Sequence, residues 1–144
     1  MLSKTKEIHF IGIGGIGMSG IAELLHSLNF VVTGSDLNNS DRTKYLSELG
    51  INIKIGHGSK NISKPDLVVY SSAVKLDNIE IIESKKKSIP IIRRAEMLGE
   101  LLKLKKTSIA ISGTHGKTTT TSLIATIFAE AGRDPTFVIG GLLN

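Results

Sequence analysis

A glycine-rich stretch near the N-terminus constrains the fold more than any other feature of this sequence. The apolar run Ile8 to Ile11 predicts a buried strand, which leads directly into residues 12–17, Gly-Ile-Gly-Gly-Ile-Gly. The G-x-G-x-x-G spacing falls on Gly12, Gly14 and Gly17, as in turns that bring a backbone close to a phosphate and then start a helix. A parallel α/β sheet with a phosphate-binding loop is therefore expected.

Two features that follow the glycines support a nucleotide site. Apolar residues with helical spacing over 16–28 predict an amphipathic helix, and a second strand follows over 30–34. Asp36 comes about 20 residues after the glycines, where this fold places an acid that bonds a ribose hydroxyl. Two alternatives stay open: Asp36 is also typical of a turn or helix cap, and Gly-rich turns also serve packing alone.

The composition argues against several classes of site. The 144 residues are 40% hydrophobic and 22% charged, include 15 glycines and no cysteine, and carry a net charge of +5. The lack of cysteine removes disulfides, thiol catalysis and zinc–thiolate sites, and the four histidines lack the i,i+4 spacing of a helical metal site. Lysines gather at 85–87 and 103–106 without interleaved aromatics, which favours a solvated face over a nucleic-acid surface. With no membrane-length apolar run and no signal-peptide core, a cytoplasmic protein without a membrane partner is expected.

Strand and helix patterns alternate about five times before Lys106. Further strands are predicted over 51–55, 66–72 and 90–92, and further helices from Ser40 or Asp41 to Leu49, over 78–88 and over 95–104. This alternation is typical of a Rossmann-like doubly wound parallel sheet.

Candidate residues follow several of these strands. Ligands of open α/β sheets gather outside the carboxyl ends of the strands, so the glycine loop, Asp36, His57 and Ser71-Ser72 are predicted to face one crevice. His57 alone is equally typical of a turn histidine. Arg93 and Arg94 follow the strand at 90–92, where contact with an anionic ligand and capping contacts to Glu96 or Glu100 are both consistent with the sequence.

A second phosphate loop follows Lys106. Residues 107–112 predict a strand, residues 113–119 read Gly-Thr-His-Gly-Lys-Thr-Thr, and a helix is predicted over 117–131. Gly116-Lys117-Thr118 supplies backbone amides for phosphates, an ammonium for the β and γ oxygens and a hydroxyl for Mg²⁺. The match to G-x-x-x-x-G-K-[ST] is incomplete, because Ile111 stands at the position of the first glycine.

Both loops resemble those of the Mur ligases, the family that builds the peptide of bacterial cell-wall precursors. The resemblance spans the chain and is carried by residues 9–20, 34–36, 71–73, 93–97, 110–119 and 137–144. It implies an ADP-forming ligase that joins L-alanine to the lactyl carboxylate of UDP-N-acetylmuramate through an acyl phosphate. The alternatives are the family's murein-tripeptide recycling ligase, an NAD(P)-binding dehydrogenase or regulatory domain, which leaves residues 113–119 unexplained, and a non-catalytic nucleotide-binding module.

The same resemblance implies a role for each loop, with ATP and Mg²⁺ as cofactors. Residues 1–106 then form a UDP-substrate domain, and residues 107–144 hold the first strand, P-loop and helix of an incomplete ATP-binding domain. The implied UDP-substrate residues are Gly12, Gly14, Gly15, Ile16, Gly17, Asp36, His57, Ser71 and Ser72. The implied ATP residues are Gly113, Thr114, His115, Gly116, Lys117, Thr118 and Thr119, with Lys117 and Thr118 catalytic and Thr118 next to Mg²⁺. The family's acidic Mg²⁺ ligand and adenine pocket lie outside these residues, so the chain alone is expected to be an inactive piece of a longer ligase.

Overall fold

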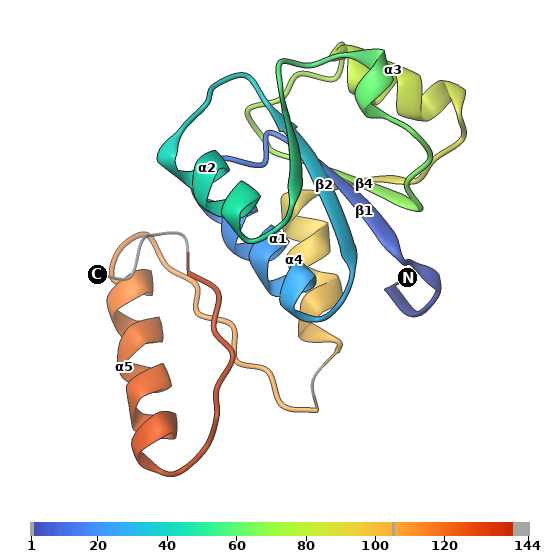
Figure 1. Ribbon diagram of the computed structural model, residues 1–144. Coiled ribbons are helices and arrows are strands. Elements are labelled where there is room, and N and C mark those ends of the chain that lie inside the picture. Colours follow the sequence, from blue (N-terminus) through green and yellow to red (C-terminus); the bar gives the residue numbers. More distant parts are fainter. Residues whose placement is uncertain (1, 105, 140–144) are drawn as a thin grey trace.

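The computed structural model describes residues 2–104 and 106–139 (Figure 1). Their elements, in chain order, are η1 (Leu2–Lys4), β1 (Glu7–Ile11), α1 (Ile16–Ser27), β2 (Val31–Asp36), α2 (Asp41–Glu48), β3 (Asn52–Ile55), η2 (Ser59–Asn61), β4 (Leu67–Tyr70), α3 (Ile79–Lys86), β5 (Ile91–Arg93), α4 (Arg94–Leu102) and α5 (Lys117–Glu130). In the first 104 residues, each predicted strand and helix is present, with ends shifted by a few residues at most.

The five strands form one parallel sheet in the order β3-β2-β1-β4-β5. At its centre, Phe10 of β1 lies opposite Gly34 of β2 and Val69 of β4. The chain runs outward from β1 to β3 and then crosses to β4 on the other side. The strand order therefore reverses between β1 and β4, which is where ligands of such sheets bind. The predicted Rossmann-like fold is confirmed.

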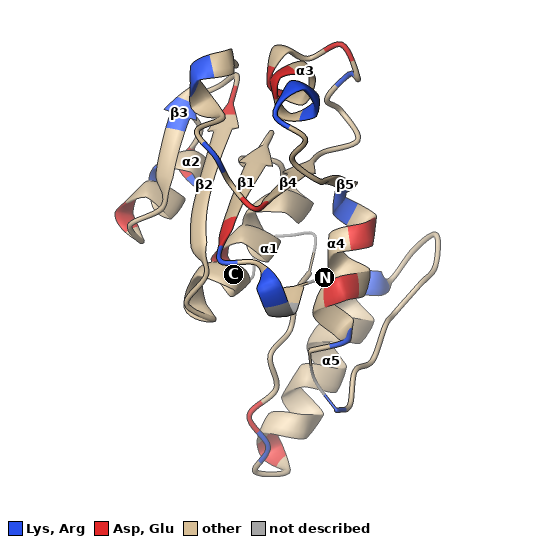
Figure 2. Ribbon diagram, turned by 90° about the vertical axis from the view of Figure 1, so that its right-hand side faces the viewer, with Lys and Arg blue, Asp and Glu red and all other residues tan. Residues whose placement is uncertain are grey.

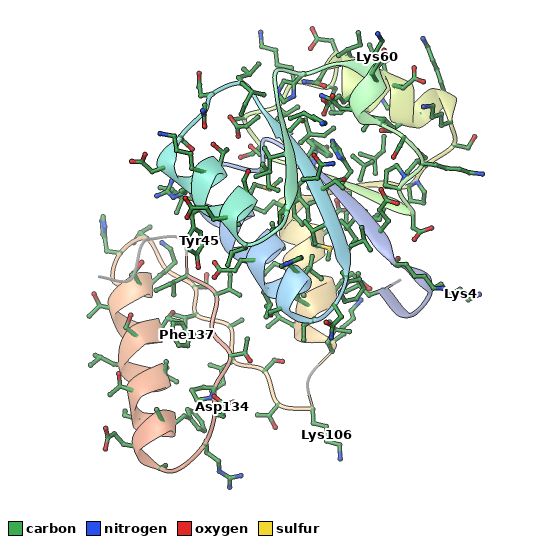
Figure 3. All side chains as sticks on the ribbon, in the orientation of Figure 1. Lys4, Tyr45, Lys60, Lys106, Asp134 and Phe137 are labelled. Carbon is green, nitrogen blue, oxygen red and sulfur yellow. The ribbon has the colours of Figure 1, made fainter. Side chains whose placement is uncertain are left out.

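Helices cover both faces of the sheet, with α1, α2 and α4 on one side and α3 on the other (Figure 1). Alternate residues of β1 serve the two faces, because side chains of a strand point in opposite directions. Ile8 and Phe10 pack in the larger core with residues of α1 and α4, whereas Ile11 packs with Val68 of β4 and Ile81 of α3. Figure 3 marks Tyr45 on α2, whose hydroxyl donates to Glu23 of α1 (2.8 Å).

Gly34 of β2 lies against Ile13 of the glycine loop, with no room for a side chain. A Cβ there would lie 2.5 Å from Ile13 Cδ1 and 3.0 Å from the Phe10 carbonyl oxygen. Gly34→Ala is therefore expected to destabilise the chain by about 1–3 kcal/mol through overpacking. Gly99→Ala is the matched control: no atom lies within 4 Å of its Cβ position, and a helical Gly→Ala change stabilises by about 0.5–1 kcal/mol. Urea denaturation of both variants measures the two effects, and equal stabilities would refute this account of Gly34.

The segment after α4 differs from its prediction in one respect. The helix predicted over 117–131 is present as α5, but the predicted strand over 107–112 is wrong, because those residues have no strand structure. A strand depends on hydrogen bonds to a neighbouring strand, and no described segment pairs with these residues. Residues 140–144, part of the family resemblance, lie outside the described residues.

The helix α5 and the segment that follows it lie beside the Rossmann-like unit (Figure 1). Val138 packs against the larger core and contacts the Cβ position of Gly20 in α1 (3.6 Å). Leu123 and Ile127 of α5 remain 60% and 66% exposed, so the apolar side of this helix is largely uncovered. None of the described helices is long and apolar enough to cross a membrane.

Candidate functional site

The carboxyl ends of the strands bring most of the predicted UDP-substrate residues to one edge of the sheet. The glycine loop follows β1, Asp36 ends β2, His57 follows β3, and Ser71-Ser72 follow β4. The basic residues Arg93 and Arg94 join this edge at the junction of β5 and α4 (blue in Figure 2).

The glycine loop is held by its own hydrogen bonds. Four of its amides donate within the protein: Gly12 and Ile13 to the Ser35 carbonyl (2.8 and 3.0 Å), Gly14 to Asp36 Oδ2 (2.8 Å), and Gly15 to the Gly12 carbonyl (3.3 Å). The next amides, of Ile16 and Gly17, belong to the first turn of α1, where a helix supplies no acceptor and its dipole favours an anion. The sequence pattern does not distinguish between the loop residues, whereas in the structure these two amides lie in the first turn of α1.

Asp36 has a structural contact of its own. Its Oδ2 accepts from the Gly14 amide, and its Oδ1 accepts from the Asn38 amide (3.1 Å). The turn contact that the sequence left open is therefore present. A carboxylate accepts more than two hydrogen bonds, so a ribose hydroxyl remains compatible with this arrangement.

Ser71 and Ser72 have different surroundings. The Ser71 backbone continues the β1–β4 ladder through a bond to the Ile11 carbonyl (3.2 Å), and its hydroxyl accepts from the Ala73 amide (3.1 Å). Ser72 lines a cavity of about 380 Å³, together with Tyr70, Val74, Lys75, Leu76, Arg93, Arg94 and Ala95. Three cations, Lys75, Arg93 and Arg94, therefore lie around one hollow at the carboxyl edge of the sheet.

The two arginines divide the roles that the sequence left open. The Arg93 amide donates to Glu96 (2.6 Å), which caps α4, and the Arg93 Nε donates to the Tyr70 hydroxyl (3.1 Å). The Arg94 guanidinium instead lies over the first turn of α1, 2.8 Å from the Cβ position of Gly17. It adds a positive charge where the free amides of α1 already favour an anion.

The edge also contains a buried carboxylate that the sequence analysis missed. Glu80, in the first turn of α3, is 0% exposed. Its donors are the Ser35 hydroxyl (2.6 Å), the Asn61 side chain (2.6 Å), the Gly58 amide (3.1 Å) and His9 Nε2 (3.4 Å), and His57 Nδ1 lies 3.7 Å away. Glu80 thus fixes the loop that carries His57 to the end of β2.

Glu80 is ionised because its donors outweigh its burial. Burial alone raises the pKa of a carboxyl, but the hydrogen bonds from His9, Ser35 and Asn61 and from one amide together lower the pKa of Glu80 to about 2. The sequence does contain a signal, since an acid between two isoleucines in the first turn of a helix is unusual on an apolar face. Its donors, however, come from three distant segments.

The predicted ATP loop has the features of a phosphate site. Gly116, at the N-cap of α5, has φ +76°, and α5 directs its first amides toward residues 113–116. The Lys117 ammonium donates to the Gly113 and Thr114 carbonyls (2.5 and 3.5 Å). Residues 112–120 are all exposed, including His115, Thr118 and Thr119. These groups fit a nucleoside triphosphate, because the lysine can replace its hydrogen bonds to loop carbonyls with hydrogen bonds to phosphate oxygens.

No group of three or more His, Cys, Asp or Glu side chains capable of holding a metal occurs in the described part of the chain. One lysine of the basic run at 85–87 has a structural contact: Lys87, which follows α3, donates to the Ile62 carbonyl (2.6 Å) and pairs with Glu83 (3.3 Å).

Comparison with known proteins gives consistent matches. A family model described as "Mur ligase family, catalytic domain" matches residues 7–106. The UDP-N-acetylmuramate–L-alanine ligase of Janthinobacterium sp. (strain Marseille) is 58% identical over 144 residues, which are all of this chain and 31% of that protein. The protein of the same name from Syntrophus aciditrophicus (strain SB) is also 58% identical over the whole chain and 30% of its own length. The chain spans about a third of the length of these curated relatives.

Solved structures give matches that agree with those of the curated sequences. A crystal structure of UDP-N-acetylmuramate-alanine ligase MurC from Thermotoga maritima matches with a TM-score of 0.89 and 40% identity, over 95% of this chain and 32% of that one. The UDP-N-acetylmuramate:L-alanyl-gamma-D-glutamyl-meso-diaminopimelate ligase of Neisseria meningitides matches with a TM-score of 0.85 and 32% identity, over 96% of this chain and 44% of that one.

Proposed function

Because this chain belongs to the Mur ligase family, we propose that it is the part of a UDP-N-acetylmuramate:L-alanine ligase that binds the UDP-substrate and begins the ATP site. The observation that carries this proposal is the identity of 56–58% with ligases of that name along every residue of the chain. The recycling ligase of the same family is less well supported, since two solved murein peptide ligases are 32% and 35% identical, against 40% for the alanine ligase.

The UDP-substrate is proposed to lie across the carboxyl ends of β1, β2 and β3. The diphosphate contacts the Ile16 and Gly17 amides, and Arg94 neutralises part of its charge. The nucleoside then extends over Asp36 toward His57, following the strand order from β1 outward. Ser71 and Ser72 border the opposite side of the diphosphate.

The second loop is proposed to bring the reacting groups together. When bound, ATP supplies the phosphoryl group that activates the lactyl carboxylate, and Mg²⁺ neutralises charge on the phosphates. Lys117, which donates to the Gly113 carbonyl, would hold the terminal phosphates, Thr118 would supply a hydroxyl to the metal, and the amides of residues 113–119 would orient the phosphates. The L-alanine amine then displaces phosphate to form the amide. In this scheme residues 1–106 are the UDP-substrate domain and residues 107–144 supply one wall of the ATP site, so the chain alone binds substrate without turnover.

Titration with UDP tests the first part of this proposal. Amide NMR shifts on adding UDP to the 144-residue chain are expected at Ile16, Gly17, Asp36, His57 and Ser71, because these residues border the proposed site. Arg94→Ala is expected to weaken UDP binding about tenfold, the order of one charge-assisted hydrogen bond. Lys106→Ala is the control, because it also removes one positive charge but at an exposed position away from the proposed site, and it should leave the affinity unchanged. Saturable NAD binding without a UDP response would contradict the proposal and favour the dehydrogenase alternative.

A further inference from the structure

The hydrogen bonds around Glu80 determine where the protons of the neighbouring side chains lie. Ser35 Oγ is 2.6 Å from Glu80 Oε2, and an ionised carboxylate only accepts hydrogen bonds. The Ser35 proton therefore lies between these two oxygens. Because a serine hydroxyl has one proton, Ser35 Oγ can only accept from any other neighbour.

That other neighbour is His57, whose Nδ1 lies 3.0 Å from Ser35 Oγ. Since the serine oxygen accepts here, Nδ1 must carry a hydrogen. Glu80 Oε1, 3.7 Å from the same nitrogen, is a second acceptor on that side of the ring. A neutral imidazole has one N–H, so Nε2 of His57 bears a lone pair. Within the described residues, no hydrogen bond or ion pair engages Nε2, and the His57 side chain is 12% exposed.

His9, the buried histidine of the cluster, has the opposite arrangement. His9 Nε2 faces Glu80 Oε2 at 3.4 Å, and its Nδ1 lies 2.9 Å from Thr33 Oγ1. The carboxylate requires a hydrogen on Nε2, and Nδ1 then accepts from the threonine hydroxyl. One carboxylate thus selects different tautomers of two histidines.

We propose that Glu80 is a positioning residue that acts through Ser35 to hold His57 as the Nδ1–H tautomer, so that Nε2 accepts a hydrogen bond from an N–H group of the nucleotide base. This role rests on the proposed function, which places a uridine diphosphate at this edge. The strand order assigns the base to His57: the phosphate lies at β1, the ribose at β2, and His57 follows β3, the next strand outward. Among the polar hydrogens of uridine, the imide N3–H is the one on the base.

The first experiment needs no ligand. Long-range ¹H–¹⁵N NMR of the histidine-labelled chain distinguishes the two tautomers, and His57→Gln identifies the His57 signals. His57 is expected as Nδ1–H. His9 is expected as Nε2–H, and so is His26, whose Nε2 donates to the Leu49 carbonyl (2.9 Å), which makes it an internal reference. A His57 spectrum of the Nε2–H type would overturn the proposal.

Glu80→Gln then tests whether the carboxylate sets the tautomer. A glutamine can keep an oxygen toward Asn61 and Gly58 while its NH₂ group takes the place of Oε2. His9 Nε2 then has to accept from this NH₂ group, so His9 also changes to the Nδ1–H tautomer and donates to Thr33 Oγ1. The NH₂ group donates to Ser35, the Ser35 hydroxyl turns to His57 Nδ1, and His57 is expected to change to the Nε2–H tautomer. Glu83→Gln, on the same helix and with the same change of charge, should leave the His57 signals as they are. A folded Glu80→Gln variant in which His57 retains Nδ1–H would also overturn the proposal.

Affinities for UDP and for N3-methyl-UDP connect the tautomer with the ligand. The wild-type chain should bind N3-methyl-UDP about tenfold more weakly than UDP, because methylation removes the donor. Glu80→Gln should bind UDP about tenfold more weakly than wild type and discriminate little between the two nucleotides, since an N–H at Nε2 then faces the imide N–H. Equal binding of both nucleotides by the wild type would refute the contact with the base. If the wild type shows the expected tautomers and binds neither nucleotide, the proposed function is what fails.

Discussion

Lys117→Ala in the full-length ligase is expected to lower kcat at least about a hundredfold. In the ligand-free chain the ammonium donates to the Gly113 carbonyl at 2.5 Å, so it already lies at the phosphate loop without a carboxylate partner in the described residues. Removing it leaves charge that develops on the transferred phosphoryl group without the cation of this loop. Phosphate release with UDP-N-acetylmuramate, L-alanine and Mg-ATP measures the effect.

Two controls separate this role from a loss of structure. Lys106→Ala removes another exposed lysine, which precedes the loop and is labelled in Figure 3. This variant should change kcat by less than about twofold. UDP affinity of the Lys117→Ala variant should equal that of the wild type, because Lys117 lies outside the proposed UDP-substrate site. Near wild-type phosphate release by Lys117→Ala would exclude the role proposed for this residue.

Glu80→Ala is expected to destabilise the 144-residue chain by about 3–5 kcal/mol, the range for removing one partner from a buried charged cluster. The change leaves the buried Ser35 hydroxyl and the partly buried Asn61 amide group and Gly58 N–H without the carboxylate that accepts from all three. Glu83→Ala removes only an accessible pair with Lys87 (3.3 Å) and should cost less than about 1 kcal/mol. Urea denaturation measures both, and similar losses for the two variants would contradict the importance given to Glu80.

The same carboxylate makes the stability depend on acid. In the folded chain the pKa of Glu80 is about 2, below its ordinary value of 4.5. The unfolded chain therefore binds more protons between these values, so the stabilisation is fully present above pH 4.5 and is lost as the pH falls toward 2. The titratable groups that face Glu80 are His9 and His57. The difference in unfolding free energy between wild type and Glu80→Gln is expected to shrink between pH 6 and pH 3.

Much of the fold could be predicted because its signals are local. The run of glycines after an apolar strand requires a close turn, and Ser40 caps α2 through reciprocal bonds with Thr43, as the sequence of a helix start suggests. The strand predicted over 107–112 failed for the converse reason, since a strand pattern is realised only where a partner strand lies beside it.

The sequence by itself determined the alternation of strands and helices in the first 104 residues, the two glycine-containing loops and the edge of the sheet at which the first loop opens, because periodicity and turn chemistry are properties of neighbouring residues. Only the tertiary structure decided how individual groups are used. It assigned the Gly14 amide to Asp36, placed Arg94 over the first turn of α1, and surrounded Glu80 with donors from β1, β2 and the loop after β3. Such contacts join residues separated by 19 to 77 positions, and their geometry depends on strand order and helix packing, which no local pattern of residues specifies.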